Sequence, residues 1–393
     1  MRKQESPSSS FVNLNDDSIL TILSFCDPIS IGRLARSCRR LRDLCGRECV
    51  WKVLANRMTT VHSCIEETSS SYSKREVCRV GKNWEESNYT NKCVIRHKPR
   101  QMPCLQIDER HLWASQNNII KCFKRLKDGS LHRSTDVTLY NQMGDICKFV
   151  YKDNRIVSGA RDGSVACWDR STGSSLFSNR EQHQSDVNGI DIVDNVIVSG
   201  SRDSTVKISR LDNAGDNWQT SINLGERVWS LAISPDKQSF ASGTSGVSDQ
   251  SPQPLKIWDL NSGTFLHNLG SNFRRGAGVL DIQYETPHIL LTCGYDTNIR
   301  LWDLRTRGLA MTWEESYDAA VYCIKSDHHN SIVSGTALYG VVRLWDKRAT
   351  KPVQLYYSGQ RSSSSPVYSL VFDTKHLYVA LDRGVHLLNF GIE

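Results

Sequence analysis

Three polar side chains in the middle of the chain are of the types that nucleophilic catalysis requires. His183, Ser199 and Asp203 follow one another at short intervals. A Ser–His–Asp triad also needs an exposed hydroxyl and a preorganised site for the oxyanion. Ser199 lies instead in an apolar, strand-like run, VIVSGS. We therefore interpret the three residues as a hydrogen-bond relay inside β-structure and predict no catalytic residue.

Arginines gather near the N-terminus. Six of them fall between Arg33 and Arg47, and the formal net charge of the whole chain is +7. A basic block of this kind can contact nucleic acid or an acidic protein. It can equally be the solvated face of a helix. Both interpretations stay open, although we expect neither nucleic acid nor a membrane among the partners.

The cysteines have no spacing that is typical of a metal site. The chain has 13 of them, without a C-x-x-C pair, and Cys38, Cys45 and Cys49 lack a fourth ligand nearby. We expect reduced thiols, no metal and no cofactor. The sequence has no run of apolar residues long enough to span a membrane and no secretory signal at its N-terminus. We therefore expect the protein in the cytoplasm, the nucleus or both.

The N-terminal segment must be helical to position these groups. Asn15 or Asp16 can cap a first helix, and Asp27-Pro28 is a start signal for a second one. An apolar stripe from Ile31 to Leu44 continues the second helix, and a third short helix follows. We predict a disordered tail over 1–10 and a three-helix domain over 11–60. Such a small domain buries little core alone, so we expect a partner for it.

From about residue 100 the chain repeats itself with strand-like alternation. Each repeat ends at a Trp-Asp pair or at a degenerate copy of one, and successive copies are 40 to 50 residues apart. This is the period of the four-stranded blades of a β-propeller. The copies begin at Phe123, Trp168, Ile208, Trp258, Trp302, Trp345 and Leu388.

The repeat unit has a physical logic. Ser-Gly upstream of each pair is expected to allow a tight turn, and the aspartate of the turn can accept hydrogen bonds from exposed backbone N–H groups. The indole is expected to pack between neighbouring blades, where a propeller buries most of its apolar area. A single blade would expose the apolar side chains of both its faces to water, so neighbouring repeats stabilise one another.

The ring must close. We predict seven blades over 101–393, with the segment from Lys92 to Arg96 as the outer strand of the last blade, paired with the C-terminal strand. Residues 61–100 would then be a helix-containing linker that ends in this closing strand. Six blades are the alternative, because the first and last repeats match the pattern weakly. The fold class is mainly β.

Residues 14–54 resemble an F-box. The resemblance lies in Asp27-Pro28, Cys38-Arg39-Arg40 and a Trp-x-x-Leu ending at Leu54, whereas the usual Leu-Pro opening is Leu14-Asn15 here. With a propeller following, the chain resembles the F-box/WD-repeat family and its dactylin-like branch. In that family the F-box binds the Skp adaptor, which joins a cullin scaffold. The resemblance implies adaptor contacts, with packing between the helices as the alternative, for Leu14, Ile19, Ile22, Leu23, Pro28 and Leu34.

The repeat register also indicates a rim on which propellers bind ligands. Two positions per blade reach it, the turn before each aspartate and the residue after the first valine of the first strand. Relatives that read phosphorylated peptides place arginines at both positions, because a guanidinium holds phosphate bidentately. Here the second position is mostly aromatic, so a groove for an apolar or aromatic peptide fits as well as a phosphate pocket. The predicted substrate-binding residues are Arg161, Arg202, Arg227, Trp229, Tyr295, Tyr322 and Tyr368.

The sequence therefore predicts a non-catalytic substrate-recognition subunit of a Skp/cullin/F-box ubiquitin ligase. Its target proteins, or short degron peptides in them, would bind the propeller. The alternative is a WD-repeat interaction scaffold outside ubiquitin pathways.

Overall fold

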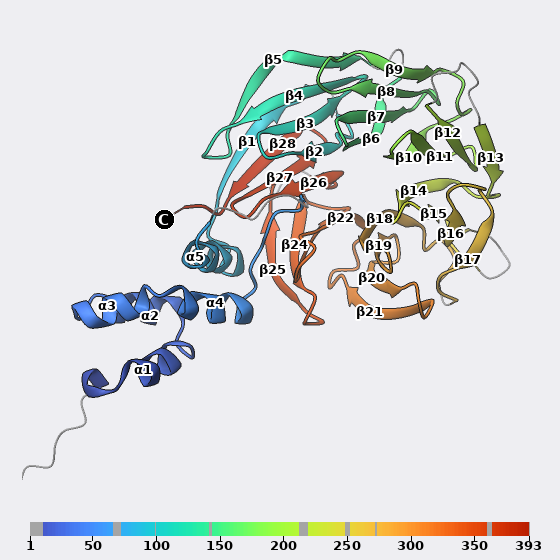
Figure 1. Cartoon of the computed structure of the whole chain (residues 1–393). Coiled ribbons are helices and arrows are strands. Elements are labelled where there is room, and N and C mark those ends of the chain that lie inside the picture. Colours follow the sequence, from blue (N-terminus) through green and yellow to red (C-terminus); the bar gives the residue numbers. More distant parts are fainter. Residues whose placement is uncertain are drawn as a thin grey trace, which may run out of the picture.

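The computed structural model describes residues 11–65, 72–98, 100–140, 144–211, 219–247, 252–271, 273–359 and 364–392. It consists of a helical part that projects from a wheel of β-sheets (Figure 1). The tail predicted over 1–10 lies outside the described residues.

The helical part begins with a 3₁₀ turn and continues with short α-helices. The Asn15 side chain accepts a hydrogen bond from Ser18 N (2.8 Å), and Asp27 accepts bonds from Ile29 N and Ser30 N. These caps satisfy N–H groups that the first turn of a helix leaves free. The elements are η1 (Phe11–Asn13), α1 (Asp16–Leu23), α2 (Pro28–Leu34), α3 (Arg39–Cys45), α4 (Glu48–Arg57) and, after a gap, α5 (Lys74–Glu85).

The described part of this region therefore has more helices than the three predicted. The stripe from Ile31 to Leu44 divides into α2 and α3, and the chain turns between them. The Ser37 hydroxyl donates to Leu34 O (2.7 Å), which occupies a carbonyl at the end of α2. Ile31, Leu41 and Leu44 nevertheless face one shared core, so the stripe predicted the buried face correctly.

The wheel is a seven-bladed propeller, as predicted, and each blade is a four-stranded antiparallel sheet. Blade one has β2 (Leu105–Ile107), β3 (His111–Gln116), β4 (Ile119–Arg125) and β5 (Leu131–Tyr140). Blade two has β6 (Ile146–Lys152), β7 (Arg155–Ala160), β8 (Val165–Asp169) and β9 (Ser175–Asn179). Blade three has β10 (Val187–Val193), β11 (Val196–Ser201), β12 (Thr205–Arg210) and β13 (Gln219–Asn223).

The later blades follow the same order from the centre outward. Blade four has β14 (Val228–Ile233), β15 (Ser239–Thr244), β16 (Leu255–Asp259) and β17 (Phe265–Asn268). Blade five has β18 (Val279–Thr286), β19 (Ile289–Gly294), β20 (Asn298–Asp303) and β21 (Gly308–Glu314). Blade six has β22 (Val321–Ser326), β23 (Ser331–Thr336), β24 (Val341–Asp346) and β25 (Pro352–Tyr357).

Blade seven closes the ring with strands from both ends of the propeller. Its inner strands are β26 (Ser369–Phe372), β27 (His376–Leu381) and β28 (Gly384–Asn389), and its outer strand is β1 (Thr90–Arg96). Lys92 pairs with Leu387 in this sheet, so the pairing predicted for 92–96 is present.

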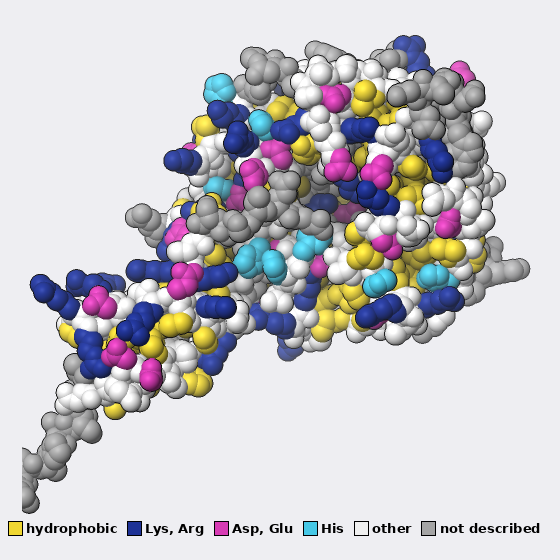
Figure 2. Space-filling model, viewed as in Figure 1, with side chains coloured by type: hydrophobic (Ala, Val, Ile, Leu, Met, Phe, Trp, Pro, Cys, Tyr) yellow, Lys and Arg dark blue, Asp and Glu magenta, His cyan; other side chains and the backbone are white. Residues whose placement is uncertain are grey.

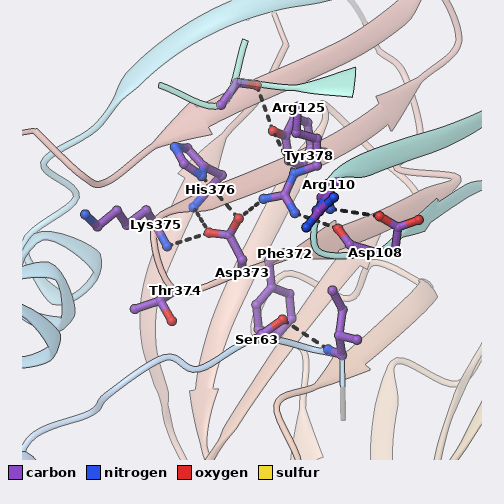
Figure 3. A network of polar contacts seen from close by, with 12 residues as sticks. Ser63, Asp108, Arg110, Arg125, Phe372, Asp373, Thr374, Lys375, His376 and Tyr378 are labelled. Atoms are coloured by element: carbon purple, nitrogen blue, oxygen red, sulfur yellow. Dashed lines mark hydrogen bonds and ion pairs between the residues drawn. The ribbon is translucent and has the colours of Figure 1, made fainter. Parts of the chain in front are cut away.

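Side chains hold the junction between blades seven and one. Figure 3 shows Asp373, in the turn after β26, between Arg125 of β4 and His376 of β27. The Tyr378 hydroxyl donates to Gly129 O (2.7 Å), and the Arg125 guanidinium lies over the Tyr378 ring. These contacts join parts of the chain that are far apart in sequence.

The Trp-Asp pairs lie at the end of the third strand of each regular blade. The indoles are buried, and those of Trp258, Trp302 and Trp345 donate to hydroxyls of the second strand, Ser242 Oγ (2.8 Å), Thr292 Oγ1 (2.9 Å) and Ser334 Oγ (2.8 Å). The aspartates accept backbone N–H groups of the following turn, as Asp259 does from Ser262 N (2.7 Å). Each pair thus fixes one strand and one turn of its blade.

The glycine of the Ser-Gly pair has a different role from the one predicted. Gly200 and Gly335 lie within the second strands β11 and β23, before the turns. A Cβ on Gly200 would come within 2.6 Å of the Val228 side chain, and a Cβ on Gly335 within 2.4 Å of Val367. The missing side chain lets the first strand of the next blade approach closely.

Candidate functional site

The propeller has two faces. On its top face the second strand of a blade turns into the third; on its bottom face the first strand turns into the second. The helical part joins the wheel at the bottom face, at blades six and seven. Ligands can therefore be considered separately for the helical part, the bottom face and the top face.

The helical part exposes apolar side chains before α1, around its end and at the start of α2. Phe25 is 73% exposed and Ile29 is 48% exposed, with Leu14 and Ile22 also at the surface. The Arg57 guanidinium lies 4.7 Å from the centre of the Phe25 ring and donates to Ser24 O. We name these four residues, Leu14, Ile22, Phe25 and Ile29, the hook patch. Contiguous exposed apolar groups of this kind are typical of a protein interface.

The structure divides the predicted adaptor contacts into two groups. Leu14 and Ile22 belong to the hook patch, and Pro28 and Leu34 are half-buried. Ile19 and Leu23 are completely buried in the core of the helical part, so in this conformation they present no surface to a partner. The structure assigns these two residues to the alternative role, packing between the helices.

Sequence reasoning missed Phe25 and Ile29. Phe25 lies in the connection after α1 and Ile29 lies in the first turn of α2, so neither belongs to the apolar stripe of α1. Asp27-Pro28 between them was interpreted only as a helix start.

The arginine block is partly engaged within the helical part. Asp16 forms ion pairs with Arg40 (2.7 Å) and Arg47 (3.2 Å), which join α1 to the start of α3 and to the residue before α4. The hydrogen bond from Arg40 is the main reason why the pKa of Asp16 is lowered. Arg36 and Arg42 donate to backbone carbonyls of their own region. Lys and Arg side chains still cover much of the visible surface there (Figure 2).

A segment after α4 runs along the bottom of blades six and seven. Residues 59–65, which we name the strap, run from α4 toward the middle of the wheel (Figure 1). Thr60 O accepts from Ser331 Oγ (3.1 Å), His62 N donates to Asp327 Oδ2 (3.2 Å), and Cys64 N donates to Phe372 O (3.1 Å).

An ion pair crosses the channel above the strap. Lys148 of blade two reaches Asp281 of blade five, with Nζ and Oδ1 3.2 Å apart, beside a cavity of only about 60 Å³. Burial alone would lower the pKa of Lys148, but the Asp281 carboxylate raises it above its ordinary value. This ion pair joins opposite blades across the channel, and the cavity beside it is too small for a peptide.

The His183 group has the geometry of a relay. His183 Nε2 lies 2.8 Å from Ser199 Oγ, and its Nδ1 lies 3.3 Å from Asp203 Oδ2 and 2.9 Å from Thr205 Oγ1. Burial lowers the pKa of His183 to about 4, so the imidazole is neutral at physiological pH. Ser199 is fully buried inside blade three, and its hydroxyl cannot meet a substrate.

The top face has an open cavity of about 270 Å³ between blades seven, one and two. Tyr368 and Arg161, both predicted, line it together with Arg100 and Met102. Arg161 Nη2 lies 3.2 Å from Met102 Sδ. Because Arg100 and Met102 lie in the connection between β1 and β2, outside the repeat register, sequence reasoning missed them.

Three predicted tyrosines continue from this cavity around the rim. The ring centres of Tyr368 and Tyr322 are 6.5 Å apart, and those of Tyr322 and Tyr295 are 6.2 Å apart in an edge-to-face arrangement. They come from blades seven, six and five. We name Tyr295, Tyr322 and Tyr368 the tyrosine row. The structure thus brings these three together as one surface, next to the cavity.

The remaining predicted residues lie on the other side of the same face. Arg202 is exposed and its Nη1 lies 3.7 Å from Asp186 Oδ2, whereas Arg227 is exposed on the connection before β14. Trp229 is half-buried, and its indole N–H is buried without a hydrogen-bond partner. Further apolar groups on this face, Tyr317, Leu338 and Tyr339, are exposed in loops and were not predicted.

Other kinds of site have less support in the described part of the chain. No described helix is long and apolar enough to cross a membrane. Among the described residues, no three His, Cys, Asp or Glu side chains are grouped so that they could hold a metal ion. All the described cysteines are free thiols.

Comparison with known proteins supports both parts of the architecture. The family model for the F-box domain matches residues 11–53, and that for the WD domain, G-beta repeat, matches 174–208 and 266–303. Each WD match begins near the outer strand of one blade and ends in the third strand of the next. The sequence repeat is therefore out of phase with the blade, which is why the ring closes with β1.

Two curated relatives match nearly the whole chain. The chain is 37% identical to F-box/WD repeat-containing protein 4 of Mus musculus over 384 residues, and 38% identical to the protein of that name from Homo sapiens over 386 residues. Each match covers 96% of this chain and 92% of the relative. Among solved structures, the computationally designed Ika8 protein has a similar fold, with a TM-score of 0.57 and 20% identity over 76% of this chain and 98% of its own.

Proposed function

The chain belongs to the F-box/WD repeat-containing proteins, and on this premise we propose that it is the substrate-recognition subunit of a Skp/cullin/F-box ubiquitin ligase. Its helical part would bind the Skp adaptor and, through it, the cullin scaffold. Its top face would bind the target protein. The protein would bring the target close to a partner enzyme, which would carry out the ubiquitin transfer.

The observation that carries the proposal is the hook patch. Phe25 and Ile29 are exposed to water in the isolated chain. Burying a large apolar side chain against a partner would contribute about 1.5–3 kcal/mol to the free energy of binding. They lie on the helical part, on the side of the wheel opposite to the top face. A partner bound there leaves the top face free for a target.

The cysteines support a non-catalytic role. Ubiquitin transfer through a covalent intermediate requires a reactive thiolate, which occurs where the thiol pKa is lowered. Burial raises the pKa of Cys78 and of Cys167 to about 11 and that of Cys147 to about 12. We also propose residence in the cytoplasm or nucleus, where thiols stay reduced.

The test is adaptor binding by the whole chain, measured by titration calorimetry with purified Skp adaptor. The intact chain is expected to bind, and Phe25→Asp is expected to weaken binding at least about tenfold, because a charge would replace a buried ring. Leu309→Asp is the control, since Leu309 is also an exposed apolar residue but lies on the outer strand β21 of the wheel. Failure of the intact chain to bind, or unchanged binding by Phe25→Asp, would contradict the proposal and favour an interaction scaffold.

A further inference from the structure

The top face combines a large cavity with an aromatic surface. The cavity has a volume of about 270 Å³, whereas a single water molecule needs only about 10–15 Å³. Its walls include apolar groups of Met102, Pro103 and Ile146, and the tyrosine row leads away from it across blades seven to five. This arrangement suits one large apolar side chain in the cavity and an extended chain along the tyrosines.

Positive charge lies beside the apolar surface. Arg161 and Arg100 line the cavity, and the Arg100 side chain is 76% exposed. In the cavity Arg161 contacts the thioether of Met102, a weak acceptor, so its guanidinium can still hold a carboxylate of the ligand. Both guanidinium groups lower the pKa of Tyr368, although burial and the Asp382 carboxylate leave that pKa raised overall. The two cations therefore act at the same place as the first aromatic ring of the row.

The same cations are arranged poorly for a phosphate. Asp145 lines the cavity, and Asp382 Oδ2 lies 3.3 Å from Arg100 Nε. A phosphoryl group carries a charge of about −1.5 to −2 and would lie close to these carboxylates. A carboxylate carries a single charge and needs one guanidinium, which Arg161 supplies.

Unsatisfied polar atoms indicate that the ligand is a peptide chain. The Gln101 side-chain carbonyl and the Trp229 indole N–H are both buried without a hydrogen-bond partner. Gln101 lines the cavity, and Trp229 occupies the rim position of blade four. One is an acceptor and the other a donor. A peptide backbone provides both kinds of partner.

Resting on the proposed function, we infer that the top face recognises an extended, unphosphorylated peptide in which an aromatic or large aliphatic side chain adjoins an aspartate or glutamate. The apolar side chain occupies the cavity beside Tyr368, and the neighbouring carboxylate binds Arg161. The rest of the peptide crosses the tyrosine row.

The experiment uses the full chain bound to the Skp adaptor and two synthetic nonamer libraries. One library is degenerate and unphosphorylated, and the other has a fixed central phosphoserine. Peptides retained by the complex are identified by mass spectrometry. The unphosphorylated library is expected to yield peptides enriched in Phe, Tyr, Trp or Leu beside Asp or Glu.

Variants then locate the binding. Tyr368→Ala and Arg161→Ala are each expected to weaken an enriched peptide about tenfold or more, while Tyr368→Phe, which keeps the ring, retains binding within about twofold. Leu309→Ala and Lys237→Ala are controls away from the top face, one on β21 and one in the turn after β14. Thermal unfolding of each variant verifies that it is folded.

Three results would overturn the inference: enrichment from the phosphoserine library alone, enrichment from neither library, or unchanged binding by Tyr368→Ala and Arg161→Ala. If the complex with the adaptor still forms in these cases, only the inference fails and the proposed function stands. If the chain does not bind the adaptor, the proposed function itself fails.

Discussion

Trp84 is the residue on which the connection between the helical part and the wheel depends most. It lies on α5 and is completely buried against blade seven, where its ring stacks on Phe390 at 3.8 Å and its Nε1 donates to Thr374 O (2.9 Å). Cys78, two turns earlier on the same helix, is buried in the core of the helical part. One helix therefore belongs to two cores.

The size of the effect of Trp84→Ala follows from these contacts. Removing a buried tryptophan destabilises a protein by about 3–5 kcal/mol, because apolar burial is lost and a cavity remains. Trp84→Phe keeps an aromatic ring that can stack on Phe390, but it removes the donor to Thr374 O and part of the ring volume. We expect it to lower the free energy of unfolding by about 1–3 kcal/mol, the cost of an unpaired buried carbonyl. The order of stability should be wild type, then Trp84→Phe, then Trp84→Ala.

Scanning calorimetry of the full chain shows the number of unfolding transitions, and denaturant unfolding measures the loss of stability. The wild type is expected to unfold in one transition, since α5 joins the two cores. In Trp84→Ala the helical part is expected to melt separately and before the wheel. Two separate transitions in the wild type would refute the coupling, and so would a loss of less than about 1 kcal/mol in Trp84→Ala.

Two further predictions concern the wheel. Burial lowers the pKa of both His183 and His376 to about 4, so the stability that these neutral imidazoles contribute is complete above about pH 6.5 and is lost as the pH falls toward 4. At pH 5 each histidine should lower the free energy of unfolding by about 2 kcal/mol. A denaturant midpoint that does not change between pH 7.5 and pH 5 would contradict this prediction. Gly335→Ala should destabilise the wheel by about 1–3 kcal/mol, because the new Cβ would lie 2.4 Å from the Val367 side chain. Gly32→Ala is the control, because nothing lies within 4 Å of the new Cβ and alanine favours the helix α2. Denaturant titration measures the stability of both variants. If Gly335→Ala is as stable as Gly32→Ala or more stable, the blades are not in close contact at Gly335.

The propeller was predictable because its signal is repeated. Four Trp-Asp pairs at a constant period fix the third strand of four blades, and the register then locates degenerate copies such as Ile208. The closing strand followed from the need to remove an exposed edge. The role of the repeated glycine could not be predicted, because the Val367 side chain that requires Gly335 belongs to the next blade.

The connection between the two parts was not predictable for a related reason. The buried residues Val77, Val80 and Trp84 follow one another at helical spacing along α5. This spacing does not show that Cys78 packs in the core of the helical part while Val80 and Trp84 pack on the wheel. The partners of Trp84, Phe390 and Thr374, come about 300 residues later in the chain.

Only those residues of the candidate sites that occupy periodic positions in the sequence were predicted. Helical spacing places Ile19, Ile22 and Leu23 on apolar faces, but it cannot tell which face meets the core and which meets a partner. On the propeller, the register found the tyrosine row because those residues occupy repeated positions. Tyr317 escaped because it lies in a connecting loop, whose length and sequence the repeat does not determine.

The arrangement of the two candidate surfaces bears directly on the proposed function. A receptor that supplies only proximity must hold its target at a fixed distance and direction from the partner enzyme, because misplacement reduces the effective concentration of the reacting groups. Here the hook patch and the tyrosine row lie on opposite sides of one rigid wheel, and α5 and the strap attach the hook to that wheel through buried contacts. A flexible linker between the same two surfaces would bind both partners equally well, but it would not orient them, and this is why the buried attachment of α5 favours a receptor that presents its target over a simple tether.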